Sequence, residues 1–120
     1  MTHPKRILLV EDEENLRLLY QEELSKEGYE VVAAGDAEGA LTALRGGGFD
    51  LIITDIRMPG KNGIELITHI MGQRRDIPII INSAYESYKD DFMTWAADAY
   101  VVKSSSLDEL KSRVQELLGS

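Results

Sequence analysis

The alternation of short apolar runs with longer amphipathic segments constrains this chain more than any other feature. The expected strands cover 7–10, 29–34, 51–54, 77–82 and 99–102, and the expected helices cover 14–27, 36–45, 63–71, 87–96 and 106–118. Asp36 is the expected N-cap of the second helix, and Ser106 with Glu109 forms a capping box for the last. Strands separated by helices run parallel, with right-handed crossovers. The pattern predicts an α/β doubly wound five-stranded parallel sheet flanked by five helices.

Length and composition narrow the class of protein. A chain of 120 residues has room for one compact domain, so we expect a single domain over residues 1–120. Cysteine is absent and no apolar stretch approaches the roughly 20 residues of a membrane helix, which favours a cytoplasmic protein that does not enter the membrane. The formal net charge of −8 argues against direct binding to nucleic acid.

Five polar residues stand where four of the apolar runs end. They are Glu11, Asp12, Asp55, Ser83 and Lys103. Open parallel sheets bind ligands beyond the carboxyl ends of their strands. The predicted fold therefore gathers three carboxylates, a hydroxyl and an ammonium at one edge, which is the composition of a reaction centre.

Three clustered carboxylates repel one another unless a cation lies among them, and Mg²⁺ prefers such oxygen ligands. Glu11 and Asp12 alone could simply begin a helix, where the helix dipole favours acids. Asp55 has no such explanation, because it follows a strand and precedes Ile56. A carboxylate beside Mg²⁺ can attack a phosphoryl donor and form an acyl phosphate. Lys103 and Ser83 would then contact phosphoryl oxygens as ammonium and hydroxyl.

The motifs that carry these residues resemble the receiver domain of two-component response regulators. The resemblance covers essentially the whole chain and lies in Ile-Leu-Leu-Val-Glu11-Asp12-Glu13, Asp50-Leu-Ile-Ile-Thr-Asp55-Ile-Arg-Met58-Pro59-Gly60, Gly63, Ser83-Ala84 and Tyr100-Val-Val-Lys103. The chemotaxis regulator of that family has a flavodoxin-like sheet of order 2-1-3-4-5. The resemblance implies the same order here.

The resemblance also implies a role for each matching residue. Asp55 would be the phosphoacceptor, Glu11 and Asp12 the Mg²⁺ acids, and the main-chain carbonyl of Arg57 a further metal ligand. Ser83 and Tyr100 would form the switch, and Lys103 would pair with the phosphoryl group. These roles describe a phosphoprotein that catalyses its own phosphorylation and dephosphorylation without being an enzyme in the ordinary sense.

Partners follow from the same resemblance. A sensor histidine kinase or a phosphotransfer protein would supply the phosphoryl group. The face made by the fourth helix, fifth strand and fifth helix would then change and control a downstream output protein or a fused effector domain. The resemblance also allows a phosphorylation-dependent dimer. In physical terms this is a population shift between two packings.

Several positions depart from the family pattern. Ser104 stands where proline usually follows the lysine, and we expect a trans Lys103–Ser104 bond because a cis bond to a non-proline residue costs about 2.5–4 kcal/mol. Asn82 replaces an apolar residue, so its amide needs a partner or must face the site. The interval from Ser83 to Lys103 is about two residues shorter than usual, which places the shortening near the fourth helix.

Two further features lie near the expected phosphoryl group. Arg57 and Tyr85 each stand two positions after a site residue and would crowd the path of an attacking water, so we predict slow self-dephosphorylation. The fourth helix is rich in aromatic residues, namely Tyr88, Phe92 and Trp95, for which core packing is the first interpretation and a partner-binding patch the second.

Other classes of protein fit less well. Aspartate-nucleophile phosphatases resemble Asp-x-Asp at the nucleophile, but here the second position is Arg57. A flavin-binding module needs an anion cradle after the first strand, where this chain has four acids over 11–14. The remaining alternative is a degenerate receiver that acts as a phosphorylation-independent docking module.

Overall fold

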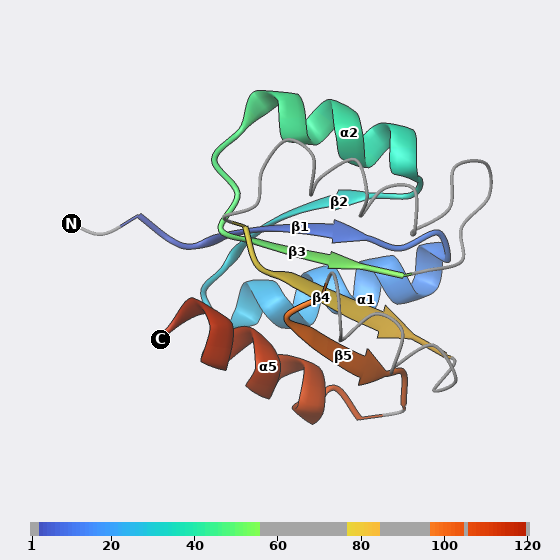
Figure 1. Ribbon diagram of the computed structural model, residues 1–120. Helices are drawn as coiled ribbons and strands as arrows, with labels where there is room; N and C mark the ends of the chain where they lie inside the picture. The colour runs from blue at the N-terminus through green and yellow to red at the C-terminus, as the bar shows by residue number, and fades with distance from the viewer. Residues whose placement is uncertain (1–2, 56–76, 85–96, 105, 120) are drawn as a thin grey trace.

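The computed structural model describes residues 3–55, 77–84, 97–104 and 106–119, and their strands form one parallel sheet (Figure 1). The strands are β1 (Arg6–Val10), β2 (Glu30–Ala34), β3 (Leu51–Thr54), β4 (Ile79–Ser83) and β5 (Ala99–Val102). Their order is β2-β1-β3-β4-β5, and every neighbouring pair is parallel. This confirms the doubly wound, flavodoxin-like order that the resemblance implied.

Helices cover both faces of this sheet. The described helices are α1 (Glu14–Lys26), α2 (Ala37–Gly46) and α5 (Asp108–Leu118). Figure 1 shows α2 on one face and α1 with α5 on the other. The expected helices at 63–71 and 87–96 lie outside the described residues, as do Arg57, Tyr85 and the aromatic residues of the latter helix.

Alternation along the buried strands divides the core into two layers. Ile7 and Leu9 of β1 belong to a cluster with Tyr20 of α1 and Val114 of α5. The intervening Leu8 and Val10 belong to a second cluster with residues of α2. Successive side chains of a strand point to opposite faces, so each strand supplies both layers. β1 and β3 consist almost wholly of buried residues, as expected for strands covered on both sides.

The local signals at helix ends are confirmed in one case and wrong in another. Asp36 caps α2, since its Oδ1 accepts a hydrogen bond from the Gly39 amide at 2.7 Å. The capping box expected at Ser106 and Glu109 is wrong: α5 begins at Asp108, and its N-cap is Leu107, one residue after Ser106, with no side-chain cap. The Ser106 hydroxyl instead accepts from the Asp108 amide at 3.2 Å. A short-range turn bond has replaced the cap.

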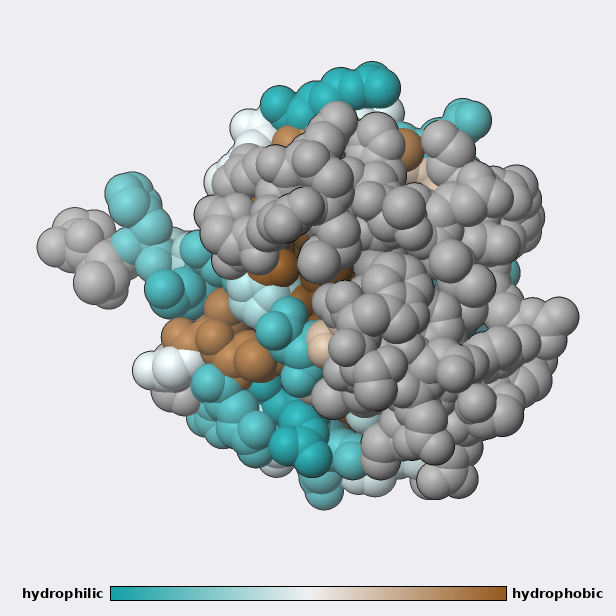
Figure 2. Space-filling view, in the orientation of Figure 1, coloured by the Kyte–Doolittle hydropathy of each residue, from teal (hydrophilic) through white to brown (hydrophobic). Residues whose placement is uncertain are grey.

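The surface of the described part is mostly polar over the helices. Figure 2 shows hydrophilic surface over much of α2 and α5, and hydrophobic surface near the C-terminal end of α5 and in the area between the two helices. On α1, Leu18 and Leu19 remain 55% and 44% exposed. Among the described helices, none has the length and apolar character needed to cross a bilayer.

Candidate phosphoacceptor and metal site

Four polar side chains lie on one face of the sheet, at its carboxyl edge. The alternation that places Leu9, Ile53, Ile80 and Val101 in the α1/α5 layer carries on, two residues further, to Glu11, Asp55, Asn82 and Lys103. Backbone pairing also extends one residue beyond the strands, because Glu11 donates to Ala34, Asp55 to Val10 and Lys103 to Ser83. The predicted convergence at one edge is therefore a direct consequence of register.

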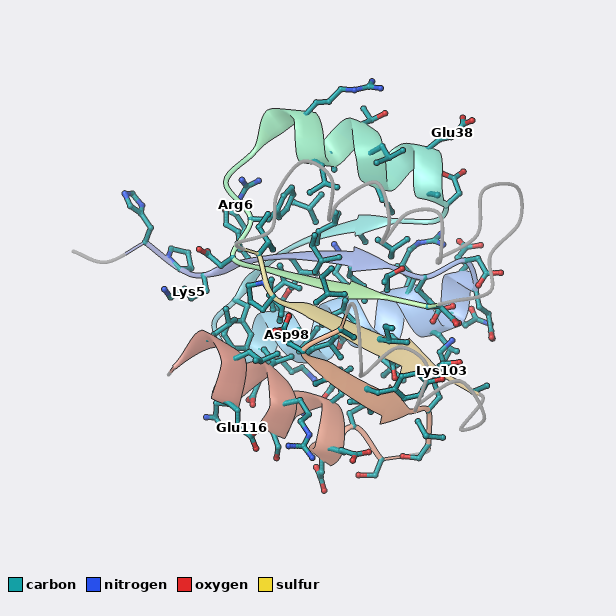
Figure 3. The ribbon with its side chains drawn as sticks, in the orientation of Figure 1. Lys5, Arg6, Glu38, Asp98, Lys103 and Glu116 are labelled. Carbon is teal, nitrogen blue, oxygen red and sulfur yellow. The ribbon has the colours of Figure 1, made fainter. Side chains whose placement is uncertain are left out.

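Lys103 binds two of the carboxylates. Its Nζ lies 2.6 Å from Glu11 Oε1 and 2.6 Å from Asp55 Oδ2. The lysine side chain is 14% exposed, and the two acids are 2% and 9% exposed. Figure 3 places Lys103 at the end of the sheet to which the strand arrows point. This ion triplet is buried enough that water screens it far less than it screens a surface salt bridge.

Burial and hydrogen bonding have opposite effects on the pKa of Lys103, and also on that of Glu11. Burial alone would lower the pKa of Lys103, but hydrogen bonds with Asp55 and Glu11 outweigh it and raise that pKa. Burial raises the pKa of Glu11, and hydrogen bonds from Lys103 and from the Glu13 amide oppose this rise. The lysine therefore stays an ammonium at neutral pH, available to bind an anion.

The acidic group has the composition of a magnesium site. Carboxylate oxygens of Glu11, Asp12 and Asp55 lie within 4.8 Å of one another, with Asp12 exposed and the other two buried. Opposite ligands of an octahedral Mg²⁺ lie roughly 4.2 Å apart, so small side-chain rotations suffice. Three carboxylates against one ammonium leave a formal charge of −2, which a divalent cation balances. The residues present fit Mg²⁺.

Arg17 of α1 holds the loop that carries two of these acids. Its Nη1 donates to the carbonyl oxygens of Glu11 and Asp12, at 2.9 and 3.5 Å. The Glu13 amide donates to Glu11 Oε2 at 3.1 Å, which fixes that carboxylate further. Sequence reasoning missed Arg17; its position on the first turn and a half of the helix after the acidic run was the available signal.

The two expected switch residues lie on the other face of the sheet. Ser83 is the last residue of β4, not the residue after it, and it is fully buried. Tyr100 of β5 is 5% exposed and packs in the α2 layer with Ile81, its register partner. Ser83 pairs in register with Val102. The structure thus brings Ser83 and Tyr100 to adjacent strands but separates their face from that of Lys103.

Two of the departures from the family pattern fall among described residues. No peptide bond between described residues is cis, so Lys103–Ser104 is trans, as expected. Asn82 is 4% exposed, and its amide opposes the rise that burial gives to the pKa of Tyr20 on α1.

Fold and site together define a class: a flavodoxin-like parallel sheet with an acidic metal group and a lysine at its carboxyl edge. The chain belongs to the response regulator receiver domain family, whose model matches residues 7–115. It is 49% identical to the response regulator TrrA from Thermotoga maritima, whose crystal structure was solved in complex with Mg²⁺-BeF. That likeness covers 95% of this chain and 99% of the other, with a TM-score of 0.89.

Two further relatives bear on partners. A crystal structure of TrrA in complex with the histidine kinase ThkA matches with a TM-score of 0.87 at 49% identity, over 95% of this chain and 98% of that chain. The transcriptional regulatory protein RprY of Bacteroides fragilis is 35% identical over 121 residues, which cover 98% of this chain and 51% of RprY. The chain spans about half the length of the curated relatives it matches.

Proposed function

We propose that this chain is a phosphorylation-dependent signalling switch that accepts a phosphoryl group on Asp55 from a histidine kinase or phosphotransfer protein. The observation that carries the proposal is the position of Asp55, which is 7% exposed as a whole residue and lies beside both the other acids of the metal group and the Lys103 ammonium. The complex of TrrA with ThkA supports a kinase as donor. A single receiver domain over residues 1–120 and a cytoplasmic location are part of the same proposal.

The transfer consists of one bond made and one broken. A carboxylate oxygen of Asp55 attacks the phosphorus, and the bond to the donor's imidazole nitrogen, or to a small donor's oxygen, breaks with its electron pair. When bound by Glu11, Asp12, Asp55 and the Arg57 carbonyl, Mg²⁺ supplies charge neutralisation for the phosphoryl oxygens. Lys103 exchanges its carboxylate partners for a phosphoryl oxygen, and Ser83, at the carboxyl end of β4, turns toward the site to donate a hydrogen bond to another.

The output would arise at β5, the edge strand of the sheet, whose Tyr100 side chain belongs to the α2 layer. Tyr100 lines a cavity of about 200 Å³ between β5 and α5, together with Asp98, Glu109, Arg113 and Glu116. Tyr100 is already buried, so phosphorylation would change which groups it contacts and not only how exposed it is. This surface would meet a downstream protein, a fused effector domain or a second phosphorylated copy. Direct contact with nucleic acid is not part of the proposal.

Phosphorylation with a small donor tests the function. Incubation with acetyl phosphate and Mg²⁺, followed by intact mass, should show one added phosphoryl group. Asp55→Asn or excess EDTA should abolish the gain. Asp50→Asn is the matched control, because Asp50 lies near the opposite end of the same strand and accepts a hydrogen bond from the Arg6 amide at 2.8 Å. Absence of any gain in the wild-type chain would favour the phosphorylation-independent docking module.

Slow self-dephosphorylation remains a prediction from the sequence, since Arg57 and Tyr85 lie outside the described residues. The loss of phosphoryl mass over time, after the donor is removed, measures it. Arg57→Asn combined with Tyr85→Glu should accelerate the decay, because both changes open the path of the attacking water. An unchanged decay rate would show that these side chains do not protect the acyl phosphate.

A further inference from the structure

Arg17 lies between the acidic loop, residues 11–13, and the residue that follows β2. It stands near the start of α1, and its Nη1 donates to the carbonyl oxygens of Glu11 and Asp12 at 2.9 and 3.5 Å. On its other side the guanidinium lies beside Gly35, which directly follows β2. The Glu11 amide also donates to the Ala34 carbonyl at 3.0 Å. The loop is therefore tied both to α1 and to the end of β2.

The absence of a side chain at Gly35 leaves room for this guanidinium. A methyl group at Gly35 would lie 2.9 Å from Arg17 Nη1, and the three atoms nearest to it all belong to the same guanidinium. That distance is too short for a side-chain contact, so Arg17 would have to move. Gly35 is not among the glycines with positive φ, so the space and not the backbone conformation favours glycine there. Nη1 is also the atom that binds both carbonyl oxygens.

The two carbonyl groups flank Asp12. They belong to the peptide groups before and after its Cα, and each peptide group is a rigid plane. A guanidinium that binds both, more weakly at 3.5 Å than at 2.9 Å, restricts the direction in which the Asp12 side chain leaves the backbone. Asp12 is the exposed member of the metal group, so packing restrains it least. Arg17 therefore orders the carboxylate that most needs an external restraint.

A positive charge beside a metal site needs an explanation. By Coulomb's law, a guanidinium next to grouped carboxylates competes with the cation that they would bind, so its charge alone weakens metal binding. Its hydrogen bonds act in the other direction, because ligands that are already held in place lose less conformational entropy when the ion binds. The charge and the hydrogen bonds of Arg17 thus predict opposite effects on metal affinity.

We propose that Arg17 is a positioning residue for Mg²⁺, which holds the backbone of Glu11 and Asp12 in the orientation that the ion requires, and that Gly35 keeps the space for it. The inference rests on the metal site that the proposed function assigns to Glu11, Asp12 and Asp55. It gives α1 and the residue after β2 a part in metal affinity without adding a ligand.

Removal of the guanidinium tests the sign of its effect. If positioning dominates, Arg17→Met should bind Mg²⁺ roughly tenfold more weakly, as expected for residues that orient metal ligands. If charge dominates, the variant should bind the ion more tightly. Titration of the folded, ¹⁵N-labelled chain with Mg²⁺, followed by NMR, measures the dissociation constant. Arg113→Met, which removes an exposed arginine of α5, is the control and should leave it unchanged. Unchanged or tighter binding in Arg17→Met would overturn the inference.

Gly35→Ala tests the space while the charge stays. The added methyl group should displace the guanidinium and weaken Mg²⁺ binding several-fold. In the Arg17→Met background the same change should alter the dissociation constant by less than about twofold, because the displaced group is gone. Gly46→Ala is the matched control, since a methyl group there meets no atom within 4 Å. An equal loss from Gly35→Ala in both backgrounds contradicts a role that acts through Arg17.

Hydrogen exchange without metal separates this inference from the proposed function. The Glu13 amide donates to Glu11 Oε2 at 3.1 Å, and in EDTA it should exchange faster in Arg17→Met and in Gly35→Ala than in the wild type. An exchange rate that is the same in all three proteins contradicts the positioning role. A wild-type chain that binds no Mg²⁺, or an Asp12→Asn variant that binds it equally well, contradicts the proposed metal site instead. The exchange rates then still decide whether Arg17 holds the loop.

Discussion

Polar clusters lie at both edges of the sheet, and they differ in charge balance. At the amino edge, Arg6 forms an ion pair with Glu30, donates to the Gly47 carbonyl at 2.8 Å, and lies 4.7 Å from the centre of the Phe49 ring. The backbone amide of Arg6 also donates a hydrogen bond to the Asp50 carboxylate at 2.8 Å. At the carboxyl edge, three carboxylates share one ammonium. Figure 3 labels Arg6 and Lys103 at these opposite ends.

The difference separates a structural cluster from a reactive one. The ion pair at the amino edge is half-exposed, at 35% for Arg6 and 52% for Glu30, and its two charges cancel. The groups at the carboxyl edge, apart from the exposed Asp12, are buried, and the cluster carries excess negative charge, which is unfavourable in the absence of a cation. A rigid sheet that holds an excess of carboxylates close together forms a binding site for a cation.

Loss of the single ammonium should have the largest effect on stability. Lys103→Met leaves two buried carboxylates without their partner and should lower the free energy of unfolding by about 3 kcal/mol in the absence of divalent cations. Urea denaturation in EDTA measures this. Lys111→Met is the matched control: its pair with Glu23 is more exposed, and its loss should matter much less. Equal losses would remove the distinction between the two kinds of pair.

Magnesium should stabilise the fold by binding at the carboxyl edge only. At ten times its dissociation constant, Mg²⁺ should raise the free energy of unfolding by about 1.4 kcal/mol. Asp12→Asn should lose most of that gain, because it removes one of the three grouped carboxylates. Arg6→Met should retain it. A gain that is the same in all three proteins would mean that the ion binds elsewhere.

Disruption of the amino edge should destabilise the fold without affecting the chemistry. Arg6→Met removes an exposed ion pair, a bond to a carbonyl and a cation–π contact, and should lower the free energy of unfolding by about 1 kcal/mol. The rate of phosphorylation by acetyl phosphate should stay at the wild-type value. A slower rate would show that the two edges are coupled through β1.

The smallest effect concerns the pair that joins α1 to α5, away from both edges. Hydrogen bonds from Lys111 and Lys26 lower the pKa of Glu23 below its ordinary 4.5. As pH falls through this range, the unfolded chain takes up the proton first, so the stabilisation present above pH 4.5 is lost below it. The difference in urea midpoint between wild type and Glu23→Gln should therefore shrink in acid. A difference independent of pH would contradict the ion pair.

Most of the fold could be predicted because its signals are local. The runs of β-branched residues and the caps near Asp36 and Gly47 locate strands and helices without knowledge of their packing. The convergence of Glu11, Asp55 and Lys103 followed from parallel strands alone. The ends of the strands were harder to predict. The expected strand stopped at residue 82, but β4 includes Ser83 because that residue still pairs with β5.

The parts that could not be predicted depend on contacts between distant segments. Arg17 belongs to an amphipathic helix, and nothing in its spacing shows that its side chain binds the acidic loop. Lys103 directly follows β5 and stands three residues after Tyr100, so alternation alone puts the two on opposite faces. Which of the two faces α1 and α5 cover depends on contacts between distant segments.

The interior place of β1 bears on how the chain is made. Of the five strands, β1 is synthesised first but lies between β2 and β3, so three neighbouring strands are complete once Asp55 has emerged from the ribosome. Glu11, Asp12 and Asp55 are then all present, whereas Lys103 follows roughly 2–10 s later at ordinary rates of translation. We expect the nascent half-sheet to gather its acids before their counter-charge exists, and cellular magnesium to assist its folding during that interval.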